Sequence, residues 1–348
     1  MIEERDLDAA VTAGILDPAA RERLQQFSRD HRRGAAGPDE EQFRLLTGFN
    51  DIFVTIAVVL VMIAVGSLAG RLAPALGAAG VAAAAWGLAE YFTRQRRMAL
   101  PSIVLLLAFV GAVFSAVMTA MSGAPVFGPG SGGGWPLLAA GAAAVAAAWL
   151  HWRRFMVPIT VAAGAAAASL LIVLLGGAAL GYGLGIAGDR SPVLLPLVAA
   201  CGVAVFALAM WFDSRDLARV TRRTDVAFWL HLLAAPMLVH PIFTLTGLTG
   251  GAPTPGAALI VVIVYAALTV VALAIDRRAL LVSALGYVIY AIQALLSGGG
   301  TLTASFGLTA LLIGLFLVLL SAAWRPIRNR VVQWLPASVA RRLPQPAG

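Results

Sequence analysis

The chain has 348 residues, of which 60% are hydrophobic and only 12% charged, and its mean hydropathy is +0.88. A soluble globular domain is roughly 45–50% apolar and about 25% charged, so this composition excludes a soluble protein and predicts one that uses lipid as part of its solvent. The net charge of +8 does not indicate a nucleic-acid partner, because all 25 basic residues are Arg in short clusters between apolar runs.

The sequence has one cysteine, Cys201, which lies within an apolar run. An intramolecular disulfide is therefore excluded, and a cysteine-based metal site is not expected. The first 50 residues are polar, so no cleavable signal peptide is predicted. We expect the first apolar run to act as an uncleaved signal anchor.

Residues 1–33 are predicted to form a cytoplasmic helical hairpin. Asp17 is a good N-cap, Pro18 suits the first helical position, and Gly14 suits the end of the preceding helix. About 33 residues bury little core, so we expect the hairpin to dock on the membrane domain, on a second copy of the chain or on a protein partner. Its predicted apolar face consists of Leu7, Ala10, Val11, Ile15, Leu24 and Phe27. Residues 34–50 follow as a linker and a short amphipathic helix that leads into the first span.

Residues 51–324 contain ten apolar runs close to the length of about 20 residues that a helix needs to cross the bilayer core. The predicted fold class is therefore all-α, a polytopic membrane bundle of about ten transmembrane helices. The runs are Ile52–Gly70, Pro74–Phe92, Ser102–Met121, Pro136–Trp152, Phe155–Gly176, Pro192–Phe212, Val226–Gly247, Gly256–Ile275, Ala279–Leu296 and Ser305–Trp324.

The distribution of Arg predicts the orientation of these spans. With the N-terminus inside, the inner segments hold 23 Arg, whereas the outer loops hold only Arg71 and Arg190. Basic residues in short loops stay on the cytoplasmic side. The sequence therefore predicts a protein of a bacterial-type inner membrane with both termini in the cytoplasm.

The inner loops resemble one another. They read RRMALPSI, RRFMVPIT, RRTDVAFW and RRALLVSA, starting at Arg96, Arg153, Arg222 and Arg277. One interpretation is a fold built by duplication of a two-helix unit. The other is that any short positive-inside hairpin made from few residue types reads in this way.

The seventh run, Val226–Gly247, is the most unusual, because it contains His231, His240, Pro236 and Pro241. The prolines remove backbone donors and predict a helix kink. One interpretation is a broken helix with proton-responsive groups near the midplane. The alternative is a kinked helix whose histidines form hydrogen bonds to neighbouring spans.

The ninth run carries a polar stripe on one helix face. The stripe comprises Ser283, Tyr287, Tyr290, Gln293 and Ser297. Lipid does not satisfy such groups, so they should face other helices or a watery cavity. The stripe therefore either forms interhelical hydrogen bonds or lines a substrate path.

Other polar residues have structural interpretations. Asn50 or Asp51 is expected to cap the first span. We expect three acidic residues near Arg clusters to form surface ion pairs and to act as topology anchors. They are Glu90, Asp213 and Asp276. Gly66 and Gly70 form one GxxxG pattern, a weak signal for helix packing.

The basic tail, residues 325–348, has two interpretations. Its apolar residues, Val331, Val332, Trp334 and Leu335, fit a segment that lies on the anionic inner leaflet. The alternative is a solvated basic tail. In either case the lipid bilayer is the partner that the sequence predicts most directly.

No catalytic, metal or cofactor motif is found. HExxH, Walker A and EF-hand patterns are absent from the sequence, and two histidines without a nearby carboxylate or thiol make an incomplete metal-ligand set. We therefore expect no cofactor, no metal and no enzymatic activity.

Three segments carry a resemblance to known proteins. They are LDAAVTAGILDPAARERLQQF, EQFRLLTGFNDIFVTIA and DVAFWLHLLAAPMLVHPIF. The chain resembles a group of bacterial multi-pass membrane proteins of unknown function, in which a short helical hairpin precedes eight or more spans. In span count alone it is also similar to the drug/metabolite transporter superfamily.

Two functions are compatible with these sequence features. The first is a structural or accessory membrane protein that engages partners, or forms a homo-oligomer, through its N-terminal hairpin. The alternative is a secondary transporter of a small molecule, with a path lined by the seventh and ninth spans. For such a path the residues of interest are His231, His240, Tyr287, Tyr290 and Gln293.

Overall fold

The computed structural model describes residues 7, 10–24, 26, 49–124, 134–181, 194–217, 219, 221–245, 255–297, 302–340 and 343. At some helical positions, including 283, 287, 290 and 293–297, only the backbone is described. The chain forms two compact units, one comprising Met1–Gln42 with Pro346–Gly348 and the other Phe43–Gln345.

The first unit contains the predicted helical segments where it is described. Residues 10–12 and 18–24 are helical, and a turn separates them. Gly14 lies in this turn with a φ of +69°, the left-handed conformation that favours glycine at a helix end. Pro18 is the first helical residue of the second segment, as predicted. On the predicted apolar face, Ile15 is 80% exposed and Leu24 is 46% exposed.

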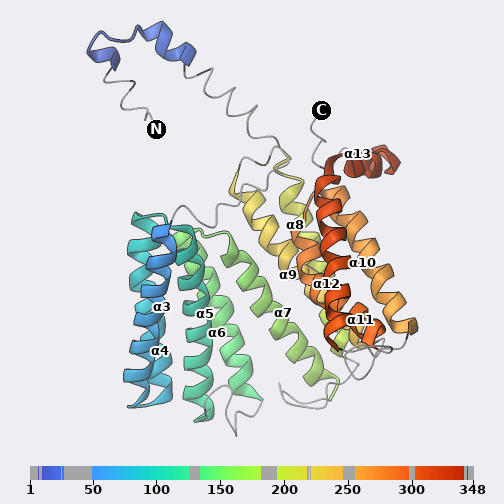
Figure 1. The fold of residues 1–348 in the computed structure, drawn as a ribbon. Helices are drawn as coiled ribbons and strands as arrows, with labels where there is room; N and C mark the ends of the chain where they lie inside the picture. Colours follow the sequence, from blue (N-terminus) through green and yellow to red (C-terminus); the bar gives the residue numbers. More distant parts are fainter. Residues whose placement is uncertain are drawn as a thin grey trace. The chain divides into compact units, whose positions relative to one another are not determined.

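The second unit is built from long helices, drawn in Figure 1. A helix lies at each of the ten predicted apolar runs, with ends that differ from the prediction by a few residues. The helices are α3 (Phe49–Gly70), α4 (Pro74–Ala89) with a π-helical continuation η1 (Glu90–Gln95), α5 (Ala99–Ser122), α6 (Trp135–Phe155), α7 (Ile159–Ala179), α8 (Leu195–Asp213), α9 (Arg222–Leu245), α10 (Pro255–Ile275), α11 (Ala279–Ser297) and α12 (Leu302–Ala322). Two shorter helices, α13 (Trp324–Trp334) and α14 (Ala337–Ala340), follow.

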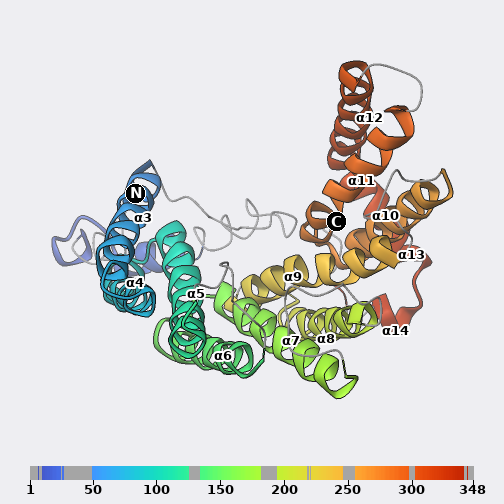
Figure 2. The ribbon, with the colours of Figure 1, turned by 90° about the horizontal axis from the view of Figure 1, so that it is seen from below.

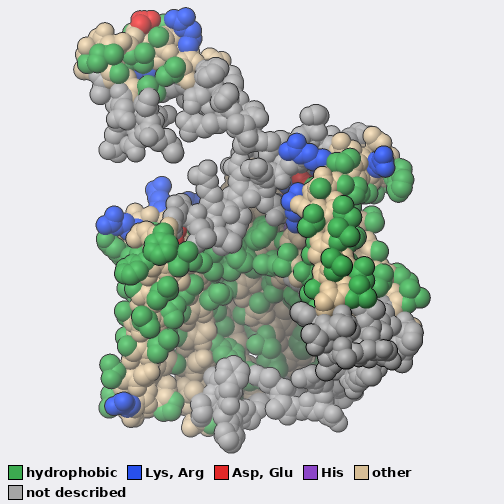
Figure 3. Space-filling model, in the orientation of Figure 1, with side chains coloured by type: hydrophobic (Ala, Val, Ile, Leu, Met, Phe, Trp, Pro, Cys, Tyr) green, Lys and Arg blue, Asp and Glu red, His purple; other side chains and the backbone are tan. Residues whose placement is uncertain are grey.

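Seven helices in the described part of the chain are long and apolar enough to cross a membrane: α3, α4 with η1, and α5 to α9. Gly307–Ala322 of α12 together with α13 would make an eighth span if this pair, bent by 73°, is counted as one. Side chains such as Leu60, Ile63 and Val318 are more than half exposed, and hydrophobic side chains cover the helices on the face shown in Figure 3. Apolar surface on this scale is normal in lipid and a liability in water. The chain is therefore a membrane-embedded, all-helical protein.

Helix α9, which contains the two predicted histidines, is the most enclosed of these spans. Half of the residues in its most apolar 18-residue stretch are buried, against 11% in the corresponding stretch of α3. It packs against α7, α8 and α11, and Figure 2 shows α7, α8 and α9 side by side. α9 runs without interruption from Arg222 to Leu245 with Pro236 and Pro241 inside it. The kink expected at these prolines stays a prediction.

Helices α3 and α4 approach closely through glycine. A Cβ on Gly77 would lie 2.7 Å from the Gly66 carbonyl oxygen and 2.8 Å from the Gly70 Cα. Both neighbouring atoms belong to the backbone of α3 and have little freedom to move. The GxxxG pattern of the first span therefore packs against the second span of the same chain.

The predicted cap of the first span is wrong. Phe49 is already helical, so Asn50 and Asp51 lie within the first turn of α3. An N-cap residue has non-helical dihedral angles and precedes the helix. Asp51 is instead 4% exposed, and its backbone carbonyl accepts a hydrogen bond from the Thr55 hydroxyl at 2.6 Å.

Candidate functional site

A buried group of charged side chains lies where the ends of α8, α9, α10 and α11 meet. We call it the buried ion-pair network, and its members are Asp213, Arg219, His231, Asp276, Arg277 and Arg328. A charge in a protein interior is stable only when it is paired and hydrogen-bonded. The partners of each carboxylate therefore decide whether these buried charges are stable.

Asp213, the last residue of α8, is the first centre of the network. Its Oδ2 accepts a hydrogen bond from Arg277 Nε at 3.2 Å, and its Oδ1 accepts one from Arg277 Nη2. The same Oδ2 lies 2.9 Å from Nε2 of His231 on α9. All three side chains are at most 5% exposed. Asp213 thus joins α8, α9 and the α10–α11 turn.

Asp276, in the turn between α10 and α11, is the second centre. Its Oδ2 accepts a hydrogen bond from Arg219 Nη1 at 2.9 Å, and its Oδ1 accepts one from Trp324 Nε1 at 2.8 Å. Nε of Arg328, on α13, lies 3.6 Å from the same Oδ1. The second carboxylate therefore holds the α8–α9 loop and the start of α13 against the α10–α11 turn.

The backbone at two of these residues is in an unfavourable conformation. Asp276 has a φ of +56° and Arg219 a φ of +54°, although neither is glycine. A left-handed backbone costs a non-glycine residue roughly 1–2 kcal/mol. The Arg219 guanidinium donates to the carbonyls of Ile275 and Asp276, each at 3.0 Å, and these bonds offset the strain.

The α8–α9 loop is held by a further carboxylate. Asp216 accepts hydrogen bonds from the Thr221 amide at 2.9 Å, the Thr221 hydroxyl at 2.6 Å and the Thr224 hydroxyl at 3.0 Å. These bonds satisfy a donor at the start of α9, where helical N–H groups have no partner inside the helix. They also place Arg219 beside Asp276.

Arg219, which lies in the loop outside the spans, has a shifted pKa. Burial lowers the pKa of its guanidinium below the ordinary value, and the nearby Arg277 charge lowers it further. Asp276 and Asp213 act in the opposite direction. An arginine remains protonated in proteins even so, so the Arg219 charge is a permanent part of the network.

The expectation for Asp213 and Asp276 was wrong, because both are buried rather than surface ion-pair residues. Glu90 does fit that expectation, since its side chain is 30% exposed and pairs with Arg94 at 3.3 Å and with Arg154. The sequence showed acidic residues beside Arg clusters, but the same pattern occurs at buried and exposed pairs.

Of the predicted polar residues, the structure describes the side chains of His231 and His240, and it does not bring these two together. His231 enters the network, whereas His240 is half-buried and lies nine residues further along α9, a rise of about 13 Å. The side chains of Tyr287, Tyr290 and Gln293 lie outside the described part of the chain. The predicted path along the seventh and ninth spans is therefore untested at the ninth.

The structure also shows a buried histidine that the sequence did not single out. His151 on α6 is fully buried among Trp86, Phe109 and Phe155, with ring centroids 4.6 to 6.3 Å away. Its Nδ1 lies 3.3 Å from the Thr160 hydroxyl. Its position three residues before Arg154 was the only signal available, and a lone histidine beside a loop is ambiguous.

Comparisons with known proteins add no assignment. Searches of protein-family models, of curated proteins and of solved structures each found no match. Among the described residues, no group of three or more His, Cys, Asp and Glu side chains is placed to hold a metal ion. The network's own chemistry is that of an ionic link between helix ends and loops, with one imidazole, His231, bound to it within α9.

Proposed function

We propose that this chain is a structural or accessory protein of a bacterial inner membrane, with ten spans and both termini in the cytoplasm. The observation that carries the proposal is the closure of the buried ion-pair network. Asp213 and Asp276 join the end of α8 and the α10–α11 turn to His231 within α9, to Arg219 in the α8–α9 loop and to Trp324 at the start of α13. A bundle locked at one end in this way is suited to rigid support of a partner.

The same contacts support the ten-span topology. The end of α8, the first turn of α9 and the turn between α10 and α11 meet at this network, where Arg277 contacts both Asp213 and the Thr224 carbonyl, as successive antiparallel crossings require. In the first half, Glu90 at the end of α4 pairs with Arg154 at the end of α6. These ends are the ones that the Arg distribution assigns to the cytoplasm.

The N-terminal hairpin supports the accessory role. Ile15 and Leu24 leave a large part of their apolar side chains exposed. Exposed apolar residues on a cytoplasmic segment are suited to bind a protein partner or a second copy. A photo-reactive residue at Ile15 should therefore form a defined crosslinked product in cells, whereas the same residue at Arg23 should form less of it.

One observation favours the alternative, a secondary transporter. The fully buried His231 is bound to Asp213, and buried ionisable pairs in membrane proteins often lie on proton pathways. Transport requires a hydrated path through the spans. The two functions therefore differ in whether water reaches the middle of α9.

The experiment is thiol labelling in a Cys201→Ser background with a membrane-impermeant maleimide. The test position is Ala234→Cys, a fully buried site on α9 that is not part of the network. The controls are Leu72→Cys, 82% exposed after α3, and Trp334→Cys, 85% exposed at the end of α13.

Intact spheroplasts should label Leu72→Cys, and only permeabilised cells should label Trp334→Cys. Ala234→Cys should stay unlabelled in both preparations. Rapid labelling of Ala234→Cys would refute the closed bundle and favour transport. Labelling of Trp334→Cys in intact spheroplasts would refute the topology.

A further inference from the structure

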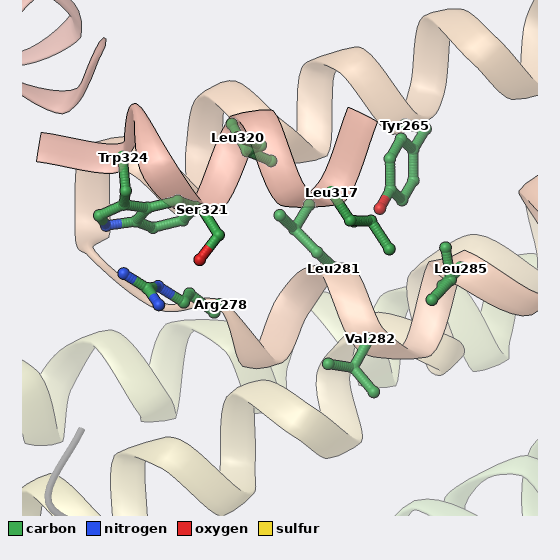
Figure 4. A pocket seen from close by; sticks show the side chains of 9 residues that line it. All are labelled: Tyr265, Arg278, Leu281, Val282, Leu285, Leu317, Leu320, Ser321 and Trp324. Atoms are coloured by element: carbon green, nitrogen blue, oxygen red, sulfur yellow. The ribbon is translucent and has the colours of Figure 1, made fainter. Parts of the chain in front are cut away.

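A cavity of about 150 Å³ lies between α10, α11 and α12 (Figure 4). Its lining residues are Tyr265, Arg278, Leu281, Val282, Leu285, Leu317, Leu320, Ser321 and Trp324. Most of this lining is aliphatic. The cavity is open on one side, since Val282 in its lining is 64% exposed. An apolar surface that is open to the bilayer is suited to contact a hydrocarbon chain.

One end of the cavity is polar and positively charged. In Figure 4, Arg278, Ser321 and Trp324 lie at the same end, and Tyr265 lies at the other. The Arg278 guanidinium stacks on the Trp324 ring at 4.8 Å. Trp324 is itself held by its hydrogen bond to Asp276 at 2.8 Å. The cation is therefore positioned by a ring that the buried network fixes in place.

Arg278 differs from its neighbour Arg277 in how its charge is balanced. Arg277 forms an ion pair with Asp213, and Asp276 is occupied by Arg219 and Arg328. Within the described part of the chain, no carboxylate forms an ion pair with Arg278. A guanidinium with this freedom binds phosphate well.

A second polar group is placed in the cavity. The Tyr265 hydroxyl is buried and has no hydrogen-bond partner among the described residues. A buried donor without a partner costs about 1–3 kcal/mol. This hydroxyl lies at the end of the cavity away from Arg278, so it does not bear on how the charged end binds a headgroup.

We propose that this cavity binds one anionic phospholipid of the inner leaflet. Its phosphate contacts Arg278, and one acyl chain lies between α11 and α12 along Leu281, Leu285 and Leu317. Basic pockets between helices on the cytoplasmic side are suited to such headgroups. The proposal rests on the topology of the proposed function, because that topology places Arg278 at the inner leaflet.

The test is native mass spectrometry of the full-length protein in detergent, titrated with phosphatidylglycerol or with phosphatidylcholine. The wild type should bind its first phosphatidylglycerol at least about tenfold more tightly than phosphatidylcholine. Arg278→Gln should remove this preference, and Arg278→Lys should retain part of it. Val282→Trp, at a cavity position that is 64% exposed, should weaken the binding of both lipids.

The matched control is Arg215→Gln. Arg215 stacks on Trp211 at 4.0 Å, so it reproduces the cation and ring but does not line the cavity. This variant should bind phosphatidylglycerol as the wild type does. Equal weakening by Arg278→Gln and Arg215→Gln, or no headgroup preference in the wild type, would overturn the proposal and show general charge attraction only. Failure of the topology would appear separately, in the labelling of Trp334→Cys.

Discussion

Asp213 and Arg277 are 64 residues apart in the sequence and form a two-point ion pair in the protein interior. Glu90 and Arg154 are also 64 residues apart and form the same kind of pair, through Nε at 2.6 Å and Nη2 at 2.9 Å. Asp213 is the last residue of α8 and Glu90 directly follows the last residue of α4, and in both pairs the arginine lies two helices later. The two pairs differ in burial, since Asp213 is 5% exposed and Glu90 is 30% exposed.

The equal spacing of the two pairs indicates which unit could be repeated in the inner loops. Helices α5 and α9 both have 24 residues, and each starts nine residues after the acid that precedes it. A repeat of four helices predicts this correspondence, whereas a repeat of two helices would place a pair at every hairpin. The duplication of a two-helix unit stays a prediction.

Removal of the Asp213 charge should destabilise the protein strongly. In Asp213→Asn, Arg277 becomes a buried charge without its carboxylate, a change that costs about 3–5 kcal/mol. The measurement is thermal unfolding of the detergent-solubilised protein. Glu90→Gln is the matched control, and it should have a much smaller effect because water solvates the Arg154 side chain. Equal losses of stability in the two variants would contradict the importance of burial.

Close packing of α3 on α4 should make Gly77 intolerant of a side chain. Gly77→Ala places its Cβ against the backbone of Gly66 and Gly70, and such overpacking costs about 1–3 kcal/mol. Gly87→Ala on the same helix has no atom within 4 Å of the added Cβ, so its stability should be unchanged or slightly raised. The check is the unfolding temperature of both variants. A stable Gly77→Ala protein would show that α3 can move away from α4.

Docking of α13 should depend on Arg328. In Arg328→Gln the ion pair with Asp276 is lost, and the amide exchange of residues 324–334 should rise by about tenfold, the factor that corresponds to about 1.4 kcal/mol. Hydrogen–deuterium exchange with mass spectrometry measures this rate. Arg330→Gln, an exposed position on the same helix, should leave it unchanged. No difference between these two variants would mean that α13 is held without the Arg328 ion pair, by the hydrogen bond from Trp324 to Asp276 and by apolar contacts.

His231 and His151, both buried, should respond differently to replacement by phenylalanine. His231→Phe removes the contact with Asp213, so we expect a loss of stability of about 1–3 kcal/mol. His151 lies among three aromatic rings, and its Nε2 has no hydrogen-bond partner among the described residues. His151→Phe removes only the contact of Nδ1 with the Thr160 hydroxyl at 3.3 Å, so its loss of stability should be the smaller of the two. Thermal unfolding of both variants provides the check, and a greater loss in His151→Phe would refute this ranking.

Much of the architecture could be predicted from local patterns. The ten apolar runs predicted the helices from α3 to α12 because about 20 apolar residues form a helix that can satisfy its own backbone in lipid. Gly14 and Pro18 predicted the ends of the N-terminal helical segments, because each residue type suits one backbone conformation. The histidines and prolines of the seventh run indicated an unusual span, and α9 is the most enclosed of the seven spans.

The candidate site could be predicted only in part. His231 was singled out because an ionisable group within a span is costly without a partner. Its partner, Asp213, was assigned to the surface because its distance from the Arg clusters in sequence resembles that of Glu90. Burial of one acid and exposure of the other follow from how α9 and the α10–α11 turn pack, which no local pattern encodes.

Sequence alone therefore determined that the chain is membrane-embedded and helical, since hydrophobicity and helix length are properties of consecutive residues. Only the tertiary structure decided which charges are buried. Asp213, Arg277 and His231 belong to three different parts of the chain, and their distances depend on helix packing. The free energy of a buried charge depends on those distances and on the exclusion of water, so it emerges only when the helices are assembled.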